Sequence, residues 1–396
     1  MAAAAPIPVI DVFAGPGGLG EGFSACRVNG QRVFRIALSI EKDRNAHATL
    51  KLRSFFRQFA DRRAPDAYYQ HLRSELTRDE LYARYPAEAD RAAQEAWHAE
   101  LGSKDLTADL VRRRIHQALD GADVWVLIGG PPCQAYSIAG RSRNRGVSGY
   151  RLEGDERHRL YEEYLRIVAD LWPPVFVMEN VKGLLSTTIR HELLFERMCD
   201  DLRDPARPVR RQKRRRYRIL SLEEAAERSL FDGELVRCFV VRAELHGIPQ
   251  SRHRVFLLGI REDLGNVTPG VLPRRAPVAA GLVLDGLPPL RSGLSRTFGR
   301  LSRNADSAEA WLDVLRREVN RRWVDGNQWI RNRDSIRALI VSTIERLRVP
   351  EADRGGEFVP GRISAGYEPA WYLDDRIGGA CNHAARVDMD GDLHQR

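Results

Sequence analysis

The 396-residue sequence lacks the features that mark exported and membrane proteins. It contains no apolar run near the roughly 20 residues that a membrane-spanning helix needs. Residues 1–6, Met-Ala-Ala-Ala-Ala-Pro, have neither the basic region nor the long apolar core of a signal peptide. We therefore expect a cytoplasmic protein that does not bind a membrane.

Cysteine is scarce, with five residues, and no two of them form a Cys-x-x-Cys pair. This spacing argues against a disulfide framework and a zinc site, so we expect no bound metal. Acidic residues are outnumbered by basic ones: the sequence has 54 Asp and Glu residues and 63 Lys and Arg residues, which gives a net charge of +9. The excess is mostly arginine, which favours phosphate contacts and moderately indicates a nucleic-acid partner.

A rigid turn at residues 129–134, Gly-Gly-Pro-Pro-Cys-Gln, follows the apolar run 123–128, which is typical of a buried strand. Two glycines and two prolines end that strand. Cys133 lies at the tip of the turn, where an α/β enzyme places a nucleophile. From this hexapeptide alone, a nucleophile and a structural cysteine are equally good interpretations.

A second glycine turn follows the apolar strand predicted over residues 7–13. The pattern Gly15-x-Gly17-x-x-Gly20 opens an amphipathic stretch at 21–28, and a helix that starts there would offer free N–H groups to an anion. A further strand, 33–40, ends at Glu41, where an acid can accept hydrogen bonds from ribose hydroxyls. Together they predict a nucleoside cofactor, and they do not separate a nicotinamide cofactor from S-adenosylmethionine.

Residues 44–101 are highly charged and helical in pattern, which indicates a surface insert over about 51–101. A solvated helical face is a better interpretation of its arginines than a dedicated DNA-binding face. Asp105 then precedes a helix predicted over 108–119. Its carboxylate suits either the edge of an adenine or a helix N-cap.

Several motifs follow one another in a fixed order over residues 7 to about 260. Together they resemble the cytosine-C5 DNA methyltransferases. They are Asp11-Val-Phe13-Ala-Gly15-Pro-Gly17-Gly18, Ser39-Ile-Glu41-Lys-Asp43, Asp105, Gly130-Pro-Pro132-Cys133-Gln134-Ala-Tyr-Ser137, Arg159-Leu160-Tyr161, Phe176-Val-Met-Glu179-Asn180-Val181 and His246-Gly-Ile-Pro249-Gln250-Ser-Arg252-His-Arg254.

The resemblance implies an α/β fold with a Rossmann-like, mostly parallel sheet and helices on both faces, the S-adenosylmethionine-dependent methyltransferase fold. We expect a catalytic domain over 1–262, then a linker and helical extension over 263–396, with amphipathic helices at 308–323 and 335–347. Because the last family motifs and the target-recognition region are not found, we expect the extension to lead toward a missing region or a second subunit.

The resemblance also implies the chemistry. Cys133 would add to C6 of a flipped cytosine, since a soft thiolate suits that carbon. Glu179, which follows the apolar strand predicted over 174–178, would protonate N3, and Arg254 would stabilise charge at O2. Arg252 would support Arg254 or contact the base or a phosphate, and Asn180 would orient the loop. The Gly- and Arg-rich segment 137–155 is expected to close over the base.

S-adenosylmethionine, converted to S-adenosylhomocysteine, is the cofactor that the resemblance implies. Lys42 departs from the apolar or aromatic residue that many relatives have against the adenine, so its stem would have to substitute. The implied contacts are Phe13, Gly15, Gly17 and Gly18 on the methionine side, Glu41 on the ribose, Asp105 on the adenine, and Pro132 and Leu160 in the wall.

The expected function is therefore DNA (cytosine-5-)-methylation of double-stranded DNA, associated with the nucleoid and serving restriction-modification or phage defence. Alternatives are a tRNA cytosine-C5 methyltransferase and a non-catalytic DNA-binding subunit of a split enzyme. The basic run 207–218 suits a mobile loop and a DNA-backbone contact equally. His383, with Asp388 and Asp390, is interpreted as polar surface and not as a metal site.

Overall fold

A computed structural model describes residues 5–59, 63–131, 156–189, 192–212, 215–223, 238–294, 306–318, 332–351 and 353–388. By packing, the chain forms two compact units, which are treated separately below. The first contains Met1–Ala64 and Tyr82–Ala279, and the second contains Pro65–Leu81 and Ala280–Arg396. The predicted division into a catalytic domain over 1–262 and an extension over 263–396 is based on motifs and not on packing, and it stays a prediction.

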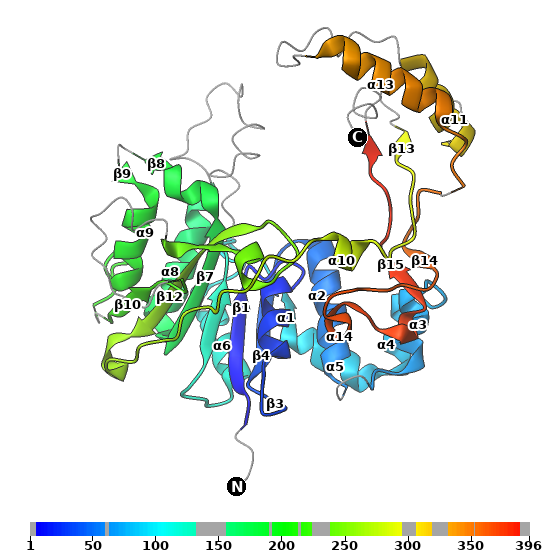
Figure 1. Ribbon diagram of the computed structural model, residues 1–396. Coiled ribbons are helices and arrows are strands. Elements are labelled where there is room, and N and C mark those ends of the chain that lie inside the picture. Colours follow the sequence, from blue (N-terminus) through cyan, green and yellow to red (C-terminus); the bar gives the residue numbers. More distant parts are fainter. Residues whose placement is uncertain are drawn as a thin grey trace. The chain divides into compact units, whose positions relative to one another are not determined.

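The first unit is built on one mixed sheet in the order β10-β12-β7-β6-β1-β4-β5, with β11 paired to β12 (Figure 1). The strands from β5 to β7 are parallel, and β12 runs antiparallel to β7, β10 and β11. The bounds are β1 (Ile7–Val12), β4 (Phe34–Glu41), β5 (Ala96–His98), β6 (Val126–Gly129), β7 (Val175–Val181), β10 (Tyr217–Leu220), β11 (Val240–Arg242) and β12 (His253–Arg261).

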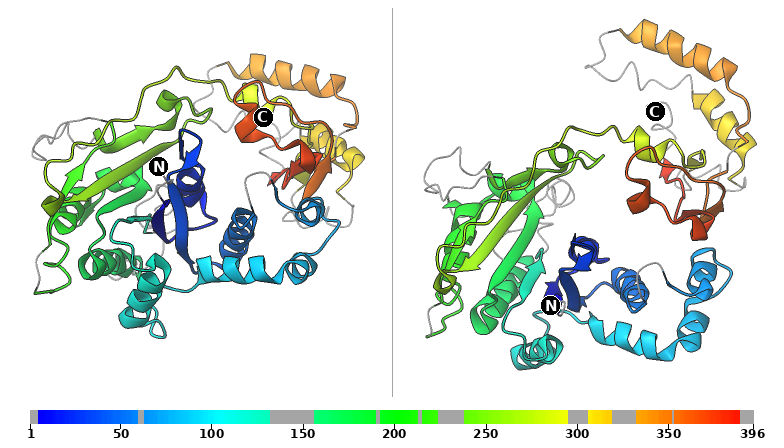
Figure 2. Two further views of the ribbon diagram at one scale, coloured as in Figure 1. Left: turned by 90° about the horizontal axis from the view of Figure 1, so that it is seen from below. Right: turned by 60° about the horizontal axis from the view of Figure 1, so that its bottom comes forward.

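Helices lie on both faces of this sheet (Figure 2). Alternate residues of a strand point to opposite faces, and the core accordingly forms two clusters. Ile10 and Leu127 pack with residues of α6 (Ala108–Leu119), α8 (Glu156–Leu171) and α9 (Leu194–Arg203) on one face. Val9 and Ile128 pack with residues of α1 (Gly18–Ala25) on the other. The predicted fold class is confirmed.

Two details of the predicted elements differ. The segment 44–101 was expected to be helical throughout, yet its end forms β5, which pairs with the carboxyl end of β4. Before it come α2 (Arg44–Arg57), α3 (Asp66–Leu72), α4 (Arg78–Arg84) and α5 (Pro86–Glu95). Glu179 was placed after its strand but lies within β7. In both cases strand pairing, which the local pattern does not contain, decides the outcome.

Short connecting elements complete the first unit. A hairpin of β2 (Arg27–Val28) and β3 (Gln31–Arg32) links α1 to β4, and a second hairpin of β8 (Thr188–Ile189) and β9 (Glu192–Leu193) precedes α9. Three 3₁₀ turns are η2 (Lys182–Ser186), η4 (Ala243–His246) and η5 (Glu262–Leu264).

The second unit combines the segment 65–81 with the later chain. Tyr69 of α3 donates a hydrogen bond to Asp374 (2.8 Å), and the guanidinium of Arg376 stacks 4.0 Å from the Tyr69 ring. The other elements are α10 (Gly281–Leu284), β13 (Gly293–Leu294), α11 (Ala308–Glu318), α13 (Arg333–Arg346), β14 (Phe358–Pro360), α14 (Pro369–Tyr372), η6 (Asp375–Ile377), β15 (Gly379–Cys381) and β16 (Val387–Asp388).

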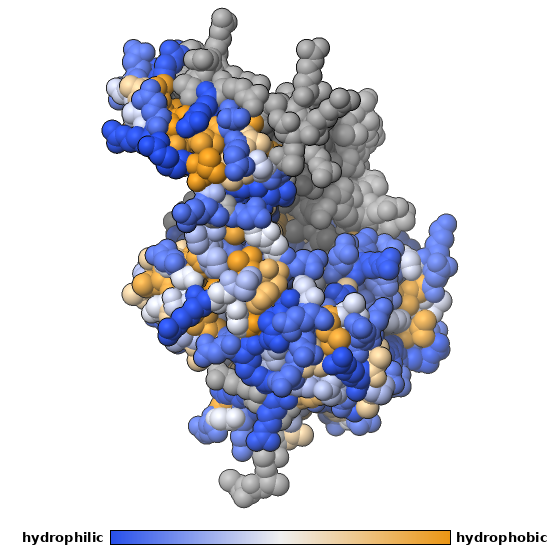
Figure 3. All heavy atoms as spheres, turned by 90° about the vertical axis from the view of Figure 1, so that its right-hand side faces the viewer, coloured by the Kyte–Doolittle hydropathy of each residue, from blue (hydrophilic) through white to orange (hydrophobic). Residues whose placement is uncertain are grey.

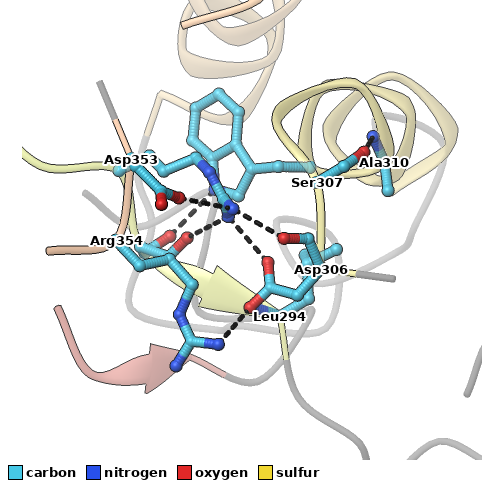
Figure 4. Close-up of polar contacts among 9 residues, drawn as sticks. Leu294, Asp306, Ser307, Ala310, Asp353 and Arg354 are labelled. Carbon is cyan, nitrogen blue, oxygen red and sulfur yellow. Dashed lines mark hydrogen bonds and ion pairs between the residues drawn. The ribbon is translucent and has the colours of Figure 1, made fainter. Parts of the chain in front are cut away.

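A polar network that includes Asp306, Asp353 and Arg354 holds the start of α11 in this unit (Figure 4). The Arg291 side chain is 3% exposed and donates to Asp306 Oδ1 (2.6 Å), to the Asp306 carbonyl (2.7 Å) and to Asp353 (3.1 Å). Arg354 donates to the second oxygen of Asp306 (2.6 Å). Segments far apart in the sequence are therefore joined through one guanidinium.

Hydrophilic residues predominate on the face drawn in Figure 3, and hydrophobic residues form small groups among them. Large apolar side chains that are more than half exposed, such as Leu339 and Trp371, are common singly on protein surfaces. In the part of the chain that the structure describes, none of the helices has the length and apolar character needed to cross a bilayer.

Candidate active site

The carboxyl ends of β1, β4, β6 and β7 meet at one edge of the sheet. The register places Val12 beside both Ile40 and Gly129, and Gly129 beside Met178. In open α/β sheets, ligands bind outside this edge. The glycine turn after β1, Glu41 at the end of β4, Gly130 after β6 and Glu179 on β7 therefore lie in one region.

The glycine turn after β1 has an unusual backbone. Phe13 and Gly15 have φ of 57°, and Gly17 has φ of 87° as the N-cap of α1. A Cβ on Gly17 would lie 2.7 Å from Cδ1 of Leu50, whereas a Cβ on Gly15 or Gly18 would have no described atom within 4 Å. The turn thus leaves open space in front of a helix N-terminus, which suits an anionic group.

Glu41 fixes that turn. One carboxylate oxygen accepts a hydrogen bond from the Gly15 N–H and the other from the Asp43 N–H, both at 2.7 Å. Each oxygen of a carboxylate has two lone-pair sites, so both can accept another bond. The neighbouring Lys42 pairs with Glu100 at 3.0 Å.

The adenine-side residues are less defined. Asp105 is exposed, and the structure gives its carboxylate no partner among the described residues. Thr107, not Asp105, caps α6 by accepting from the Leu110 N–H, so the N-cap interpretation of Asp105 was wrong. Leu160 is buried in the first turns of α8, and Pro132 falls outside the described ranges.

Glu179 and Arg254 form an ion pair at this edge of the sheet. Arg254 Nε lies 2.9 Å from Glu179 Oε1, and the side chains are 25% and 28% exposed. Because Phe256 is the residue opposite Glu179 and Arg254 lies two positions earlier on β12, the pair is a diagonal one on one face. The Arg254 Nη1 also donates to the His253 carbonyl at 2.8 Å.

Burial raises the pKa of the Glu179 carboxyl above its usual value, and Arg254 and Arg252 lower it in part. A Cβ built on Gly130 would lie 3.1 Å from Glu179 Oε2. The backbone that leads to residue 133 therefore begins directly beside this carboxyl. Cys133 itself and the predicted loop 137–155 lie outside the described residues.

Asn180 has a local role that fits the predicted one. Its side chain is buried, and its Oδ1 accepts a hydrogen bond from the Val181 N–H at 2.8 Å. Alternation along β7 directs it to the face opposite Glu179. It therefore steadies the backbone between the strand and η2 without approaching the carboxyl.

A buried charge network beneath the turn was not predicted. Burial raises the pKa of Asp11 to about 8; the charge of Glu41 also raises this pKa, and the charge of Arg57 lowers it. Among the described atoms, Asp11 Oδ2 has no hydrogen-bond partner. Arg57 bonds Glu21 of α1 and Glu95 of α5. The one sequence feature that could have indicated this network is Asp11 itself, an acid within the apolar strand predicted over 7–13.

The basic run 207–218 makes intramolecular contacts where it is described. Arg211 bonds Asp170 through two nitrogens (2.5 and 2.8 Å), Arg215 lies 4.5 Å from the Trp172 ring, and Arg218 donates to two backbone carbonyls. Tyr217 pairs with Arg261 at the end of β12, and Ile260 pairs with Val175 at the start of β7. The basic run therefore lies at the end of the sheet where β7 begins, opposite the end that carries Glu179.

His383 is also engaged within the chain, because its Nε2 lies 2.7 Å from the Pro288 carbonyl. Within the described ranges, three or more His, Cys, Asp or Glu side chains nowhere gather as a metal-binding group.

A mostly parallel α/β sheet with a glycine turn, a strand-end acid and a half-buried Glu–Arg pair at one edge defines a nucleoside-cofactor enzyme architecture. Residues 67–205 match the model of the C-5 cytosine-specific DNA methylase family. This match covers about a third of the chain, which is similar to that family over those residues.

Relatives of known name point to the same family. The chain is 30% identical over 302 residues to the type II methyltransferase M.Bpa9945I of Bacillus paralicheniformis, covering 72% of this chain and 61% of that one. It is 34% identical over 146 residues to the DNA (cytosine-5-)-methyltransferase M.ApeKI of Aeropyrum pernix, covering 37% and 29%. The chain thus spans less than two thirds of the length of either relative.

Among solved structures, the chain is similar to the methyltransferase EhMeth of Entamoeba histolytica, with 14% identity and a TM-score of 0.36 over 69% of this chain and 58% of that one.

Proposed function

We propose that this protein transfers a methyl group to C5 of cytosine in double-stranded DNA. The observation that carries the proposal is the Glu179–Arg254 pair beside Gly130, at the same edge as the glycine turn. The match to the family model over residues 67–205 and the names of the relatives support it. The relatives named as type II methyltransferases also support a role in restriction-modification.

Glu179 acts on the base in this proposal. Burial favours the neutral carboxyl, and a neutral carboxyl can donate a proton to N3 of the ring. As the Cys133 thiolate adds to C6, the electron pair moves into the ring and the proton neutralises it, so C5 becomes nucleophilic. Once C5 carries the methyl group, loss of the C5 proton to a base, departure of the Cys133 thiolate from C6 and return of the N3 proton to Glu179 restore the aromatic ring.

Arg254 keeps the carboxyl in place and supplies a fixed positive charge. Its Nε contacts Glu179 while Nη1 is held by a carbonyl, so the guanidinium is oriented before a base arrives. A fixed cation stabilises negative charge that develops at O2 better than water does, since it need not reorganise. Arg252 is exposed and contributes charge to the same site.

The residues around the glycine turn fit S-adenosylmethionine. Glu41 retains acceptor sites for ribose hydroxyls, and the open space over Gly15 and Gly18 leaves room beside the α1 N-terminus for a carboxylate. Phe13 and Gly17 would complete that side, with Asp105, Leu160 and Pro132 near the adenine. The cofactor, when bound, supplies an electrophilic methyl group.

A product analysis tests the proposal. Purified protein is incubated with methyl-labelled cofactor and unmodified plasmid DNA, and the DNA is digested to nucleosides. We expect the label in 5-methyldeoxycytidine. Label in another nucleoside, or in tRNA but not in DNA, contradicts the proposal.

Two variants of the protein sharpen this assay. Glu179→Gln should lower the rate about 10²–10⁴-fold, the usual contribution of a general acid. Glu196→Gln, on the exposed surface of α9, is the matched control and should leave the rate unchanged. Equal rates for the two variants would remove Glu179 from the mechanism.

A further inference from the structure

The first unit contains a pocket of about 380 Å³ at the amino-terminal end of β4. Its lining comes from β3, β4 and the helices α1, α2, α5 and α6. The volume falls within the range of about 300–1,000 Å³ that is typical of small-molecule sites. The pocket is therefore large enough for a ligand of metabolite size.

This pocket is separate from the candidate active site. Phe34, the first residue of β4, lines the pocket, whereas Glu41 is the last residue of that strand. Seven residue steps at about 3.3 Å each place these positions about 23 Å apart. A ligand in the pocket would occupy the opposite edge of the sheet from the cofactor turn.

Positive charge dominates the described lining of the pocket. Five arginines from five elements reach it, and one lining residue, Glu95, is acidic. Guanidinium groups bind phosphate oxygens bidentately, and a cleft lined by one sign of charge concentrates ions of the opposite sign. The arginines are Arg32, Arg35, Arg57, Arg91 and Arg114.

Two of these arginines have no carboxylate partner. Arg114 donates to the Gln94 carbonyl (2.7 Å) and to the Gln117 side chain (3.3 Å), both of them neutral. Arg35 is exposed and has no partner among the described residues. By contrast, Arg57 is paired with Glu95, and Arg91 with Glu88. The uncompensated charge therefore comes from β4 and α6.

Strand β4 adds apolar groups to the lining of the pocket. Phe34, Ile36 and Ala37 contribute to it, and Phe34 is held by an edge-to-face contact with Phe23 of α1. Apolar groups beside several converging positive charges suit an organic ligand that carries phosphate. We propose that this pocket binds a small phosphate ester of nucleotide size, with its phosphates on Arg35 and Arg114.

Calorimetric titration tests this proposal on the full chain. Inorganic pyrophosphate and guanosine triphosphate are the probes, because guanosine avoids competition with an adenosine-containing cofactor. We expect saturable binding of both at one site. The Arg35→Gln/Arg114→Gln variant should weaken binding at least about tenfold, because both charge-assisted contacts to the phosphates are lost.

The control variant is Arg112→Gln/Arg113→Gln, which removes two exposed arginines of the same helix α6 and should bind both probes as the unmodified protein does. The single variant Arg35→Gln, at an exposed position, keeps the test valid if the double variant unfolds, and it should also weaken binding. Absence of saturable binding, or equal weakening in the control, overturns the proposal. So does binding of a short DNA duplex through Arg35 and Arg114 without binding of guanosine triphosphate.

Discussion

At the scale of single residues, the environment of Glu179 decides its chemistry. The sequence identified Glu179 and Arg254 through their motifs, and the structure brings them to 2.9 Å. Their separation of 75 positions gives no local signal of contact, since the antiparallel pairing of β7 with β12 produces it. The raised pKa likewise depends on burial, which only the assembled sheet creates.

The pH profile of methylation tests the role of Glu179 as an acid. Its protonated form is the active one, so the rate should fall as pH rises through its pKa. Arg252 lowers that pKa, and Arg252→Gln should therefore move the alkaline limb of the rate profile to higher pH. Arg197→Gln, on the exposed surface of α9, is the control. An unchanged alkaline limb in Arg252→Gln contradicts the assignment.

Asp11 provides a second residue-scale prediction, because burial raises its pKa to about 8 in the folded protein from an ordinary value of 3.8. Between these values the unfolded chain loses the proton first, so stability falls as pH rises toward about 8. Asp11→Asn cannot ionise, and its melting temperature relative to the unmodified protein should increase from pH 5 to pH 9.

Thermal unfolding at both pH values measures this difference, with the exposed Asp90→Asn as control. If the difference in melting temperature between Asp11→Asn and the unmodified protein stays constant or shrinks as pH rises, Asp11 ionises normally.

At the scale of elements, the turn between β1 and α1 was well predicted. The glycine spacing indicated the turn, and the positive φ of Gly15 and Gly17 explains why glycine is needed. The helix that follows was predicted over 21–28 but spans Gly18–Ala25, because Gly17 caps it and Cys26 already has extended backbone. Local residues therefore fix the turn and the start of the helix, while the extended chain that leads into β2 ends it.

Two alanine substitutions separate strain in this turn from helix propensity. Gly17→Ala places a Cβ at φ of 87° and 2.7 Å from Leu50, and it should lower stability by about 1–3 kcal/mol and weaken cofactor binding. Gly22→Ala, inside α1 with no described atom near its Cβ, should raise stability by up to about 1 kcal/mol. Chemical denaturation and cofactor titration give both values, and equal effects of the two substitutions would count against a strained turn.

At the scale of the whole molecule, motif order predicted the sheet and the candidate site but not the packing of the later chain. The pattern 335–347 gave α13 (Arg333–Arg346) nearly to the residue. It could not show that residues 65–81 pack with the segment after 280, because contacts such as Tyr69–Asp374 join positions 305 apart. Likewise, nothing in the sequence marked Arg291 as buried.

The second unit should depend on that arginine. Arg291→Met leaves Asp306 and Asp353 without their shared partner, and loss of one member of a buried ion pair costs about 3–5 kcal/mol. Hydrogen exchange should therefore rise in 280–294, 306–318 and 353–388 while the sheet of the first unit keeps its protection. Arg362→Met, at an exposed position of the same unit, should change nothing. Unaltered exchange in Arg291→Met would mean that the network contributes little.

Covalent trapping tests most directly the claim that the protein methylates cytosine through a thiol adduct. DNA in which 5-fluorocytosine replaces cytosine is incubated with the protein and S-adenosylmethionine, and the products are separated on a denaturing gel. Fluorine at C5 blocks the final elimination, so we expect a stable protein–DNA complex that disappears in Cys133→Ala and persists in Cys199→Ala. A complex that survives Cys133→Ala, or no complex with the active protein, would contradict the account.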